Sequence, residues 1–129
     1  MNPVLFCWNL QPQRRQILRS FCDTENVLLR PVTAAECAVP LAALGQNPRQ
    51  TGLQRMPFED EMLLMAGFSD RQLDRLLRAL RQEGMQTVRL KAVLTPHNAS
   101  WDSLHLYREL SDEASRMSGG RPPQTRPEE

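Results

Sequence analysis

Apolar residues gather in four short runs, and each run is followed by a polar or amphipathic stretch. Residues 3–9 and 61–68 are apolar at successive positions, which is typical of strands buried on both faces of a sheet. Residues 27–32 and 87–94 carry charges among their apolar positions, which is typical of strands at the edge of a sheet. The pattern therefore predicts four strands, with the first and third at the centre.

Helical periodicity appears between and after these runs. The clearest case begins with a capping box, Ser69-x-x-Gln72, followed by leucines at i, i+3, i+4 and i+7. Weaker patterns predict a first helix after Pro12, a short proline-interrupted helix over 34–44, and a last helix over 101–117.

The order of these elements suggests that one unit occurs twice. Residues 3–44 and 60–117 each predict strand, helix, strand and helix, which indicates an internal repeat of two β-α-β-α units within one four-stranded sheet. Two strand orders place the first and third strands at the centre: a parallel 2-1-3-4 sheet or a ferredoxin-like antiparallel 4-1-3-2 sheet. Burial of the central strands on both faces favours the parallel α/β form, with the ferredoxin-like form as the alternative.

A chain of 129 residues provides one hydrophobic core, so we expect a single α/β domain over 1–117. Residues 45–59 lack an apolar period and are rich in Gln, Gly and Pro, which predicts a mobile loop. Residues 118–129 are rich in Gly, Pro and charge, which predicts a disordered tail.

Composition narrows the class of protein. The formal net charge of +1 gives no indication of binding to nucleic acid or to an anionic membrane. No apolar run approaches the ~18–20 residues that span a bilayer, and the N-terminus lacks the features of a signal peptide. The three cysteines have no C-x-x-C spacing and cannot all pair, so we expect reduced, buried thiols in a cytoplasmic protein.

Candidate chemistry gathers at the end of the fourth strand. Lys91 is the only lysine among sixteen basic residues. This indicates a position where the guanidinium group of arginine cannot replace the ammonium group of lysine. If the strand runs parallel to its neighbours, the following turn lies where open α/β folds bind ligands, beside a helix N-terminus that favours anions. We therefore hypothesise a site for a small anionic ligand, formed by Lys91, Thr95, His97, Asn98 and Trp101.

The same residues also have structural explanations. Asn98 or Ser100 is a normal helix cap, Trp101 is a normal first-turn anchor, and Lys91 suits a solvated strand face. The alternative function is a protein-interaction module that self-associates through an edge strand. Ligand binding predicts Lys91 and Asn98 unpaired in an open pocket, whereas interaction predicts both paired internally and an exposed apolar surface.

Catalytic and metal chemistry have little support. The chain lacks the glycine-rich phosphate-binding motifs and the G-x-S-x-G motif, and nothing in it indicates a cofactor. His97 and His105 are eight positions apart without partners at metal-ligand spacing, so no metal site is expected. His97 acting as a general base is a third hypothesis, but no catalytic residue is identified. Ligand identity and oligomeric state stay open.

The second half of the chain resembles a known family. Residues 60–111 contain a Leu-Lys-Ala-Val-x-Thr strand, a Thr-x-x-Asn-x-x-Trp turn and a leucine-rich helix with a glutamate. This pattern is similar to that of the bacterial family catalogued as domain of unknown function 3783. The matching positions are Leu90, Lys91, Ala92, Val93, Thr95, Asn98, Trp101, Leu106 and Glu109. That family has no established activity, so the resemblance implies a location and no reaction.

Overall fold

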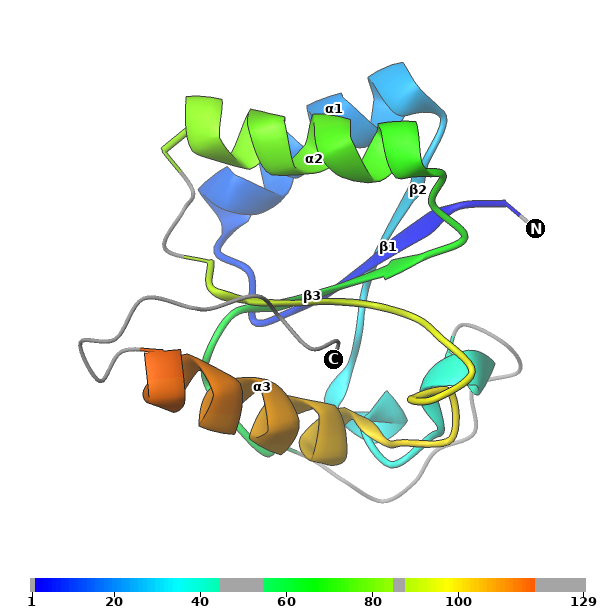
Figure 1. Cartoon of the computed structure of the whole chain (residues 1–129), viewed down its shortest axis with the longest axis vertical. Helices are drawn as coiled ribbons and strands as arrows, with labels where there is room; N and C mark the ends of the chain where they lie inside the picture. Colours follow the sequence, from blue (N-terminus) through cyan, green and yellow to red (C-terminus); the bar gives the residue numbers. More distant parts are fainter. Residues whose placement is uncertain (1, 45–54, 85–87, 118–129) are drawn as a thin grey trace.

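The computed structural model describes residues 2–44, 55–84 and 88–117. The expected tail over 118–129, and residues 45–54 of the expected mobile loop, lie outside these ranges. Within them, the helices cover both faces of one sheet (Figure 1). The strands are β1 (Val4–Trp8), β2 (Leu28–Pro31), β3 (Met62–Ala66) and β4 (Leu90–Val93). The α-helices are α1 (Pro12–Glu25), α2 (Asp70–Gln82) and α3 (Ser103–Met117).

The strand order is β2-β1-β3-β4, which confirms the predicted order 2-1-3-4. The outer pairs β1–β2 and β3–β4 are parallel, but the central pair is antiparallel, with Val4 opposite Ala66 and Trp8 opposite Met62. The expectation of an entirely parallel sheet is therefore wrong for the central pair, and the ferredoxin-like order is also wrong. Burial on both faces does not fix strand direction, because β1 and β3 are apolar throughout and bury equally well either way.

Each half of the sheet is a β-α-β unit with a parallel strand pair. Because β1 and β3 run in opposite directions, a rotation about an axis normal to the sheet relates the two units. Such a rotation does not exchange the two faces of the sheet, so the connecting helices α1 and α2 lie side by side on the same face (Figure 1). The other face is left for the segments that follow β2 and β4.

Strand alternation divides the core into two layers. One layer points towards α1 and α2 and contains Leu5, Cys7, Leu63 and Met65. Towards α3 point Phe6, Trp8, Met62 and Leu64, which pack with Leu106 of that helix. No helix within the described ranges is both long and apolar enough to cross a membrane.

The helix expected over 34–44 is instead two 3₁₀ turns, η1 (Ala34–Glu36) and η2 (Leu41–Ala43). Pro40 disfavours a helical conformation at the residue before it and lacks an N–H, so no continuous helix passes through it. The second turn is held from outside, because Leu41 N–H donates to the Trp101 carbonyl at 2.8 Å and Ala42 N–H to the Ala99 carbonyl at 3.0 Å. The segment after β2 is thereby fixed to the turn after β4.

Candidate functional site

Asn98 organises the turn that follows β4. Its side chain is buried, its Oδ1 accepts from the Thr95 N–H at 2.9 Å, and its Nδ2 donates to the Val93 carbonyl at 3.0 Å. The Asn98 N–H in turn donates to the Thr95 hydroxyl at 3.3 Å. Both polar atoms of the side-chain amide are thus hydrogen-bonded to the protein's own backbone.

Lys91 lies away from this turn. It is paired with Leu63 in the sheet, and Leu63 belongs to the layer beneath α1 and α2, so Lys91 is on that face. Its half-buried Nζ donates to the Val88 carbonyl at 2.5 Å, back towards the start of β4. Burial lowers the pKa of this ammonium group. Trp101, in contrast, packs on the α3-side layer.

The structure therefore brings together Thr95, His97, Asn98 and Trp101 but leaves Lys91 on the opposite face. The hypothesis placed all five at one rim, and the alternation of side chains along β4 separates them. The hypothesised anion site consequently lacks its cation. Lys91 and Asn98 are both paired internally, as the interaction alternative predicts.

Asn98 also covers part of the outer edge of β4. The Leu94 N–H donates to the Met65 carbonyl at 2.9 Å, so in a parallel ladder the backbone of Lys91 and Val93 faces the open edge. Asn98 occupies the Val93 carbonyl there. At the opposite edge, Pro31 in β2 has no N–H to offer. Both edges are thus poorly suited to strand addition, and the geometry does not favour self-association through them.

The start of α3 differs from the expected cap at Asn98 or Ser100. The helix begins at Ser103, and the Asp102 Oδ1 accepts from the His105 N–H at 2.9 Å, so Asp102 is the cap. The buried Ser103 hydroxyl accepts from the indole N–H of Trp8 at 3.0 Å. These bonds fix the first turn of α3 to the centre of the sheet.

Trp101 is held at the surface between both histidines of the chain. Its ring stacks on His105, with centroids 4.2 Å apart and planes 14° apart, and meets His97 edge-on at 5.3 Å. Its backbone is fixed because its N–H donates to the Asn98 carbonyl at 3.0 Å. The site hypothesis omitted His105, although the four-residue spacing of Trp101 and His105 in the expected last helix is a signal for one shared surface.

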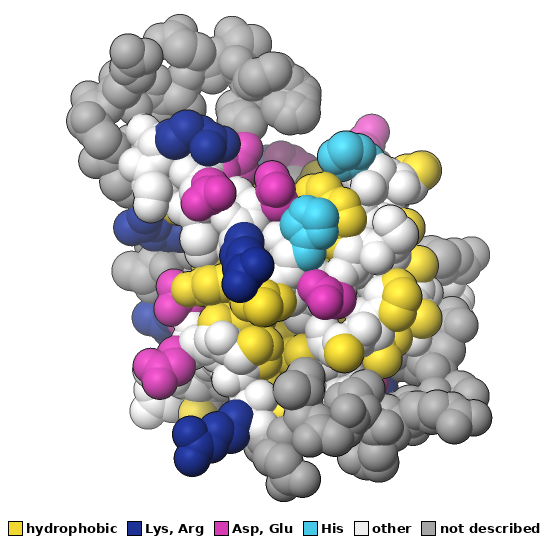
Figure 2. Space-filling model, turned by 90° about the horizontal axis from the view of Figure 1, so that it is seen from below, with side chains coloured by type: hydrophobic (Ala, Val, Ile, Leu, Met, Phe, Trp, Pro, Cys, Tyr) yellow, Lys and Arg dark blue, Asp and Glu magenta, His cyan; other side chains and the backbone are white. Residues whose placement is uncertain are grey.

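A groove with a volume of about 700 Å³ runs beside Trp101, between α3 and residues 38–40. We call it the Trp101 groove. Its apolar lining comes from Ala38, Pro40, Trp101 and Leu104. Its polar lining comes from Ser100, Asp102, His105, Arg108, Glu109 and Asp112. Figure 2 shows this face, where the two histidine side chains lie among hydrophobic, acidic and basic ones.

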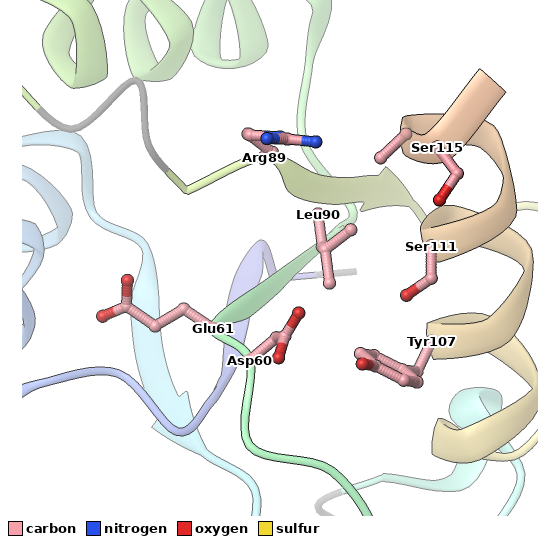
Figure 3. Close-up of a pocket in the computed structure, with 8 residues that line it drawn as sticks. Asp60, Glu61, Arg89, Leu90, Tyr107, Ser111 and Ser115 are labelled. Carbon is pink, nitrogen blue, oxygen red and sulfur yellow. The ribbon is translucent and has the colours of Figure 1, made fainter. Parts of the chain in front are cut away.

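A second hollow of about 500 Å³ lies further along α3, where that helix passes the start of β4. We call it the hydroxyl pocket because Tyr107, Ser111 and Ser115 of α3 line it (Figure 3). Asp60 faces them from the segment before β3, and Arg89 lies at the start of β4. No motif marked this pocket, since its residues come from three segments that lie about 17–55 positions apart.

In the part of the chain that is described, no group of side chains is arranged as a catalytic site. There, no three His, Cys, Asp or Glu residues are grouped as metal ligands. Within the same ranges His97 contacts Trp101 and has no carboxylate to orient it as a base. Burial raises the pKa of the Cys7 thiol to about 11 and that of Cys22 to about 12, which disfavours the nucleophilic thiolate.

Comparison with known proteins gives one finding. The family model described as Domain of unknown function (DUF3783) matches residues 61–117. No curated protein and no solved structure matches the chain. The matched segment runs from β3 to α3, so it supplies most of the Trp101 groove and most of the hydroxyl pocket.

Proposed function

Residues 61–117 belong to the family Domain of unknown function (DUF3783), and from the geometry of this half we propose a protein-interaction function. The Trp101 groove binds a segment of another protein that carries cationic and apolar side chains. The alternative of a small anionic ligand at the end of β4 has less support, because Lys91 is on the other face and both polar atoms of the Asn98 amide are bonded to the backbone.

The rigid placement of Trp101 carries this proposal. Tryptophan is enriched among the residues that dominate binding energy at protein interfaces, where it works best when it is already ordered. Trp101 is ordered by the backbone bonds to Asn98 and Leu41, and by the ring contacts to His97 and His105. A partner would therefore meet a fixed aromatic wall and lose little conformational entropy from this side.

The charges of the groove support a cationic partner. Asp102, Glu109 and Asp112 place three carboxylates around it, against the single guanidinium of Arg108. Complementary charge favours encounter with lysine- or arginine-bearing segments and disfavours acidic ones. Pro40 and Leu104 beside Trp101 supply apolar contact area for the aliphatic stem or a neighbouring apolar side chain of such a segment.

Selection from a displayed peptide library tests this proposal with a defined readout. We expect wild-type protein to enrich peptides that combine Lys or Arg with aromatic or aliphatic residues. Synthetic copies of those peptides should bind the Trp101→Ala variant roughly 30-fold more weakly, the effect of losing an interface anchor. Fluorescence anisotropy measures the dissociation constants.

A matched control is Leu28→Ala, which removes a large side chain that is 59% exposed on another part of the surface. Binding of the selected peptides should be the same as for wild type. Enrichment of acidic peptides, equal binding by Trp101→Ala, or no enriched sequence would each contradict the proposal.

We also propose a bacterial cytoplasmic location and an origin of the two β-α-β units as an internal repeat. The three cysteines are all unpaired and buried, which suits a reducing compartment. The bacterial assignment rests on the family resemblance, and the repeat rests on the common order of elements in the two halves.

A further inference from the structure

The hydroxyl pocket contains a ladder of side-chain hydroxyls along α3. Tyr107, Ser111 and Ser115 recur every four residues and face the same hollow (Figure 3). At a rise of 1.5 Å per residue, successive members are about 6 Å apart along the helix axis. The Cα atoms of the three residues therefore span about 12 Å along the helix axis, the length of a molecule with several hydroxyl groups rather than of a single ion.

Four polar side chains of this pocket have no hydrogen-bond partner within the described residues. Neither the Asp60 carboxylate nor the hydroxyls of Tyr107, Ser111 and Ser115 form a hydrogen bond or ion pair with those parts of the chain. Tyr107 is nevertheless fixed, because its ring stacks on Phe58 with centroids 4.2 Å apart and planes 3° apart. These four side chains thus offer donors and acceptors without partners in the described residues, the reverse of the situation at Asn98.

The charges that reach the pocket balance. Asp60 contributes one carboxylate and Arg89 one guanidinium, from opposite sides of the hollow (Figure 3). Glu61 is turned away, because its carboxylate pairs with Arg14 and accepts from the Gln11 N–H at 3.1 Å. A ligand with net charge of either sign therefore gains no advantage over a neutral one.

We propose that the hydroxyl pocket binds a neutral polyhydroxylated molecule of mono- to disaccharide size. A sugar hydroxyl both donates and accepts, as do the hydroxyls of the ladder, and the Asp60 carboxylate accepts from two of them. Leu90 and Ala114 give the pocket an apolar wall for the C–H face of such a molecule. The volume of about 500 Å³ lies in the range of small-ligand sites.

Titration of ¹⁵N-labelled full-length protein tests the proposal. The neutral probes are glucose, galactose, maltose, trehalose and sorbitol, and the charged probes are glucose 6-phosphate and glucosamine. We expect at least one neutral probe to shift the amide resonances of residues 107–115, and to bind more tightly than the charged probes. The Ser111→Ala variant should bind it roughly fivefold more weakly, and Asp60→Asn roughly tenfold, because the second removes a charged acceptor.

Ser20→Ala is the control, since Ser20 is also a helical serine but lies exposed on α1. It should bind like wild type, and so should Trp101→Ala, which separates this site from the Trp101 groove. Dispersed spectra of each variant confirm that it is folded. The proposal is overturned by the absence of binding to every neutral probe, by tighter binding of a charged probe, or by unchanged affinity in Ser111→Ala and Asp60→Asn.

Discussion

Replacing Asn98 with alanine is expected to lower the free energy of unfolding by about 3 kcal/mol. The buried amide donates to the Val93 carbonyl and accepts from the Thr95 N–H, and alanine leaves both backbone groups without these partners. The same turn presents the carbonyls of Ala99 and Trp101 to η2, so loosening it also weakens the contact between the two halves of the α3-side layer. Urea unfolding followed by circular dichroism measures the shift in midpoint.

Thr95→Ala provides a graded control for this prediction. It removes only the hydroxyl that accepts the Asn98 N–H at 3.3 Å, and that N–H also reaches the Thr95 carbonyl at 3.2 Å. We expect a loss of about 0.5–1 kcal/mol. A second readout is size-exclusion chromatography, because Asn98→Ala frees the Val93 carbonyl at the edge of β4 and should promote self-association. If Asn98→Ala costs no more than Thr95→Ala, then the amide is not what holds the turn.

Strand order was predictable from sequence because the burial of a strand determines whether its residues are apolar or charged. The apolar runs of β1 and β3 require neighbours on both sides, and the charged residues Arg30 and Lys91 in β2 and β4 indicate edges. Strand direction has no such effect on the composition of the two central strands. It depends on the end of the sheet at which β3 begins, and no residue pattern in β1 or β3 encodes that choice.

The turn of the candidate site was predictable because it depends on residues that are close together in the sequence. Its contacts with other segments were not predictable. Thr95, Asn98 and Trp101 act on one another over a few residues, so their spacing alone indicated a structured turn. The pairing of Trp101 with Leu41 and of Tyr107 with Phe58 joins segments about 50–60 positions apart. Hydrophobic periodicity cannot identify such contacts, because each partner is an ordinary apolar position in its own element.

The helix α3 lines part of both proposed binding surfaces, and this follows from the way it is buried. Leu106 is 1% exposed and anchors α3 to the sheet, and the layer beneath α3 also holds Leu110 and Ala114. The flanks of the helix are therefore left for other roles. Its N-terminal half carries His105 and Arg108 beside the Trp101 groove, and its C-terminal half carries Ser111 and Ser115 in the hydroxyl pocket.

Alkaline pH is expected to destabilise the fold through its buried thiols. Burial raises the pKa of Cys7 from 9.0 to about 11 and that of Cys22 to about 12. Well below pH 9 the thiols are protonated in both states, so their contribution to stability is complete. As the pH rises from the unfolded-state value of 9.0 towards the folded-state values, the unfolded chain releases these protons first, and the contribution is lost.

Between its unfolded-state and folded-state pKa values, each thiol lowers the free energy of unfolding by about 1.4 kcal/mol per pH unit. We therefore expect a fall of about 2–3 kcal/mol from pH 8 to pH 10. Lys91 offsets a part of it, because burial lowers its pKa and its contribution therefore rises with pH. Urea unfolding at a series of pH values, under reducing conditions, measures the profile. The Cys7→Ala, Cys22→Ala double variant should be less stable at pH 8, since both side chains are buried, yet should lose much less stability by pH 10. Parallel profiles for the variant and the wild type would show that other groups cause the alkaline loss.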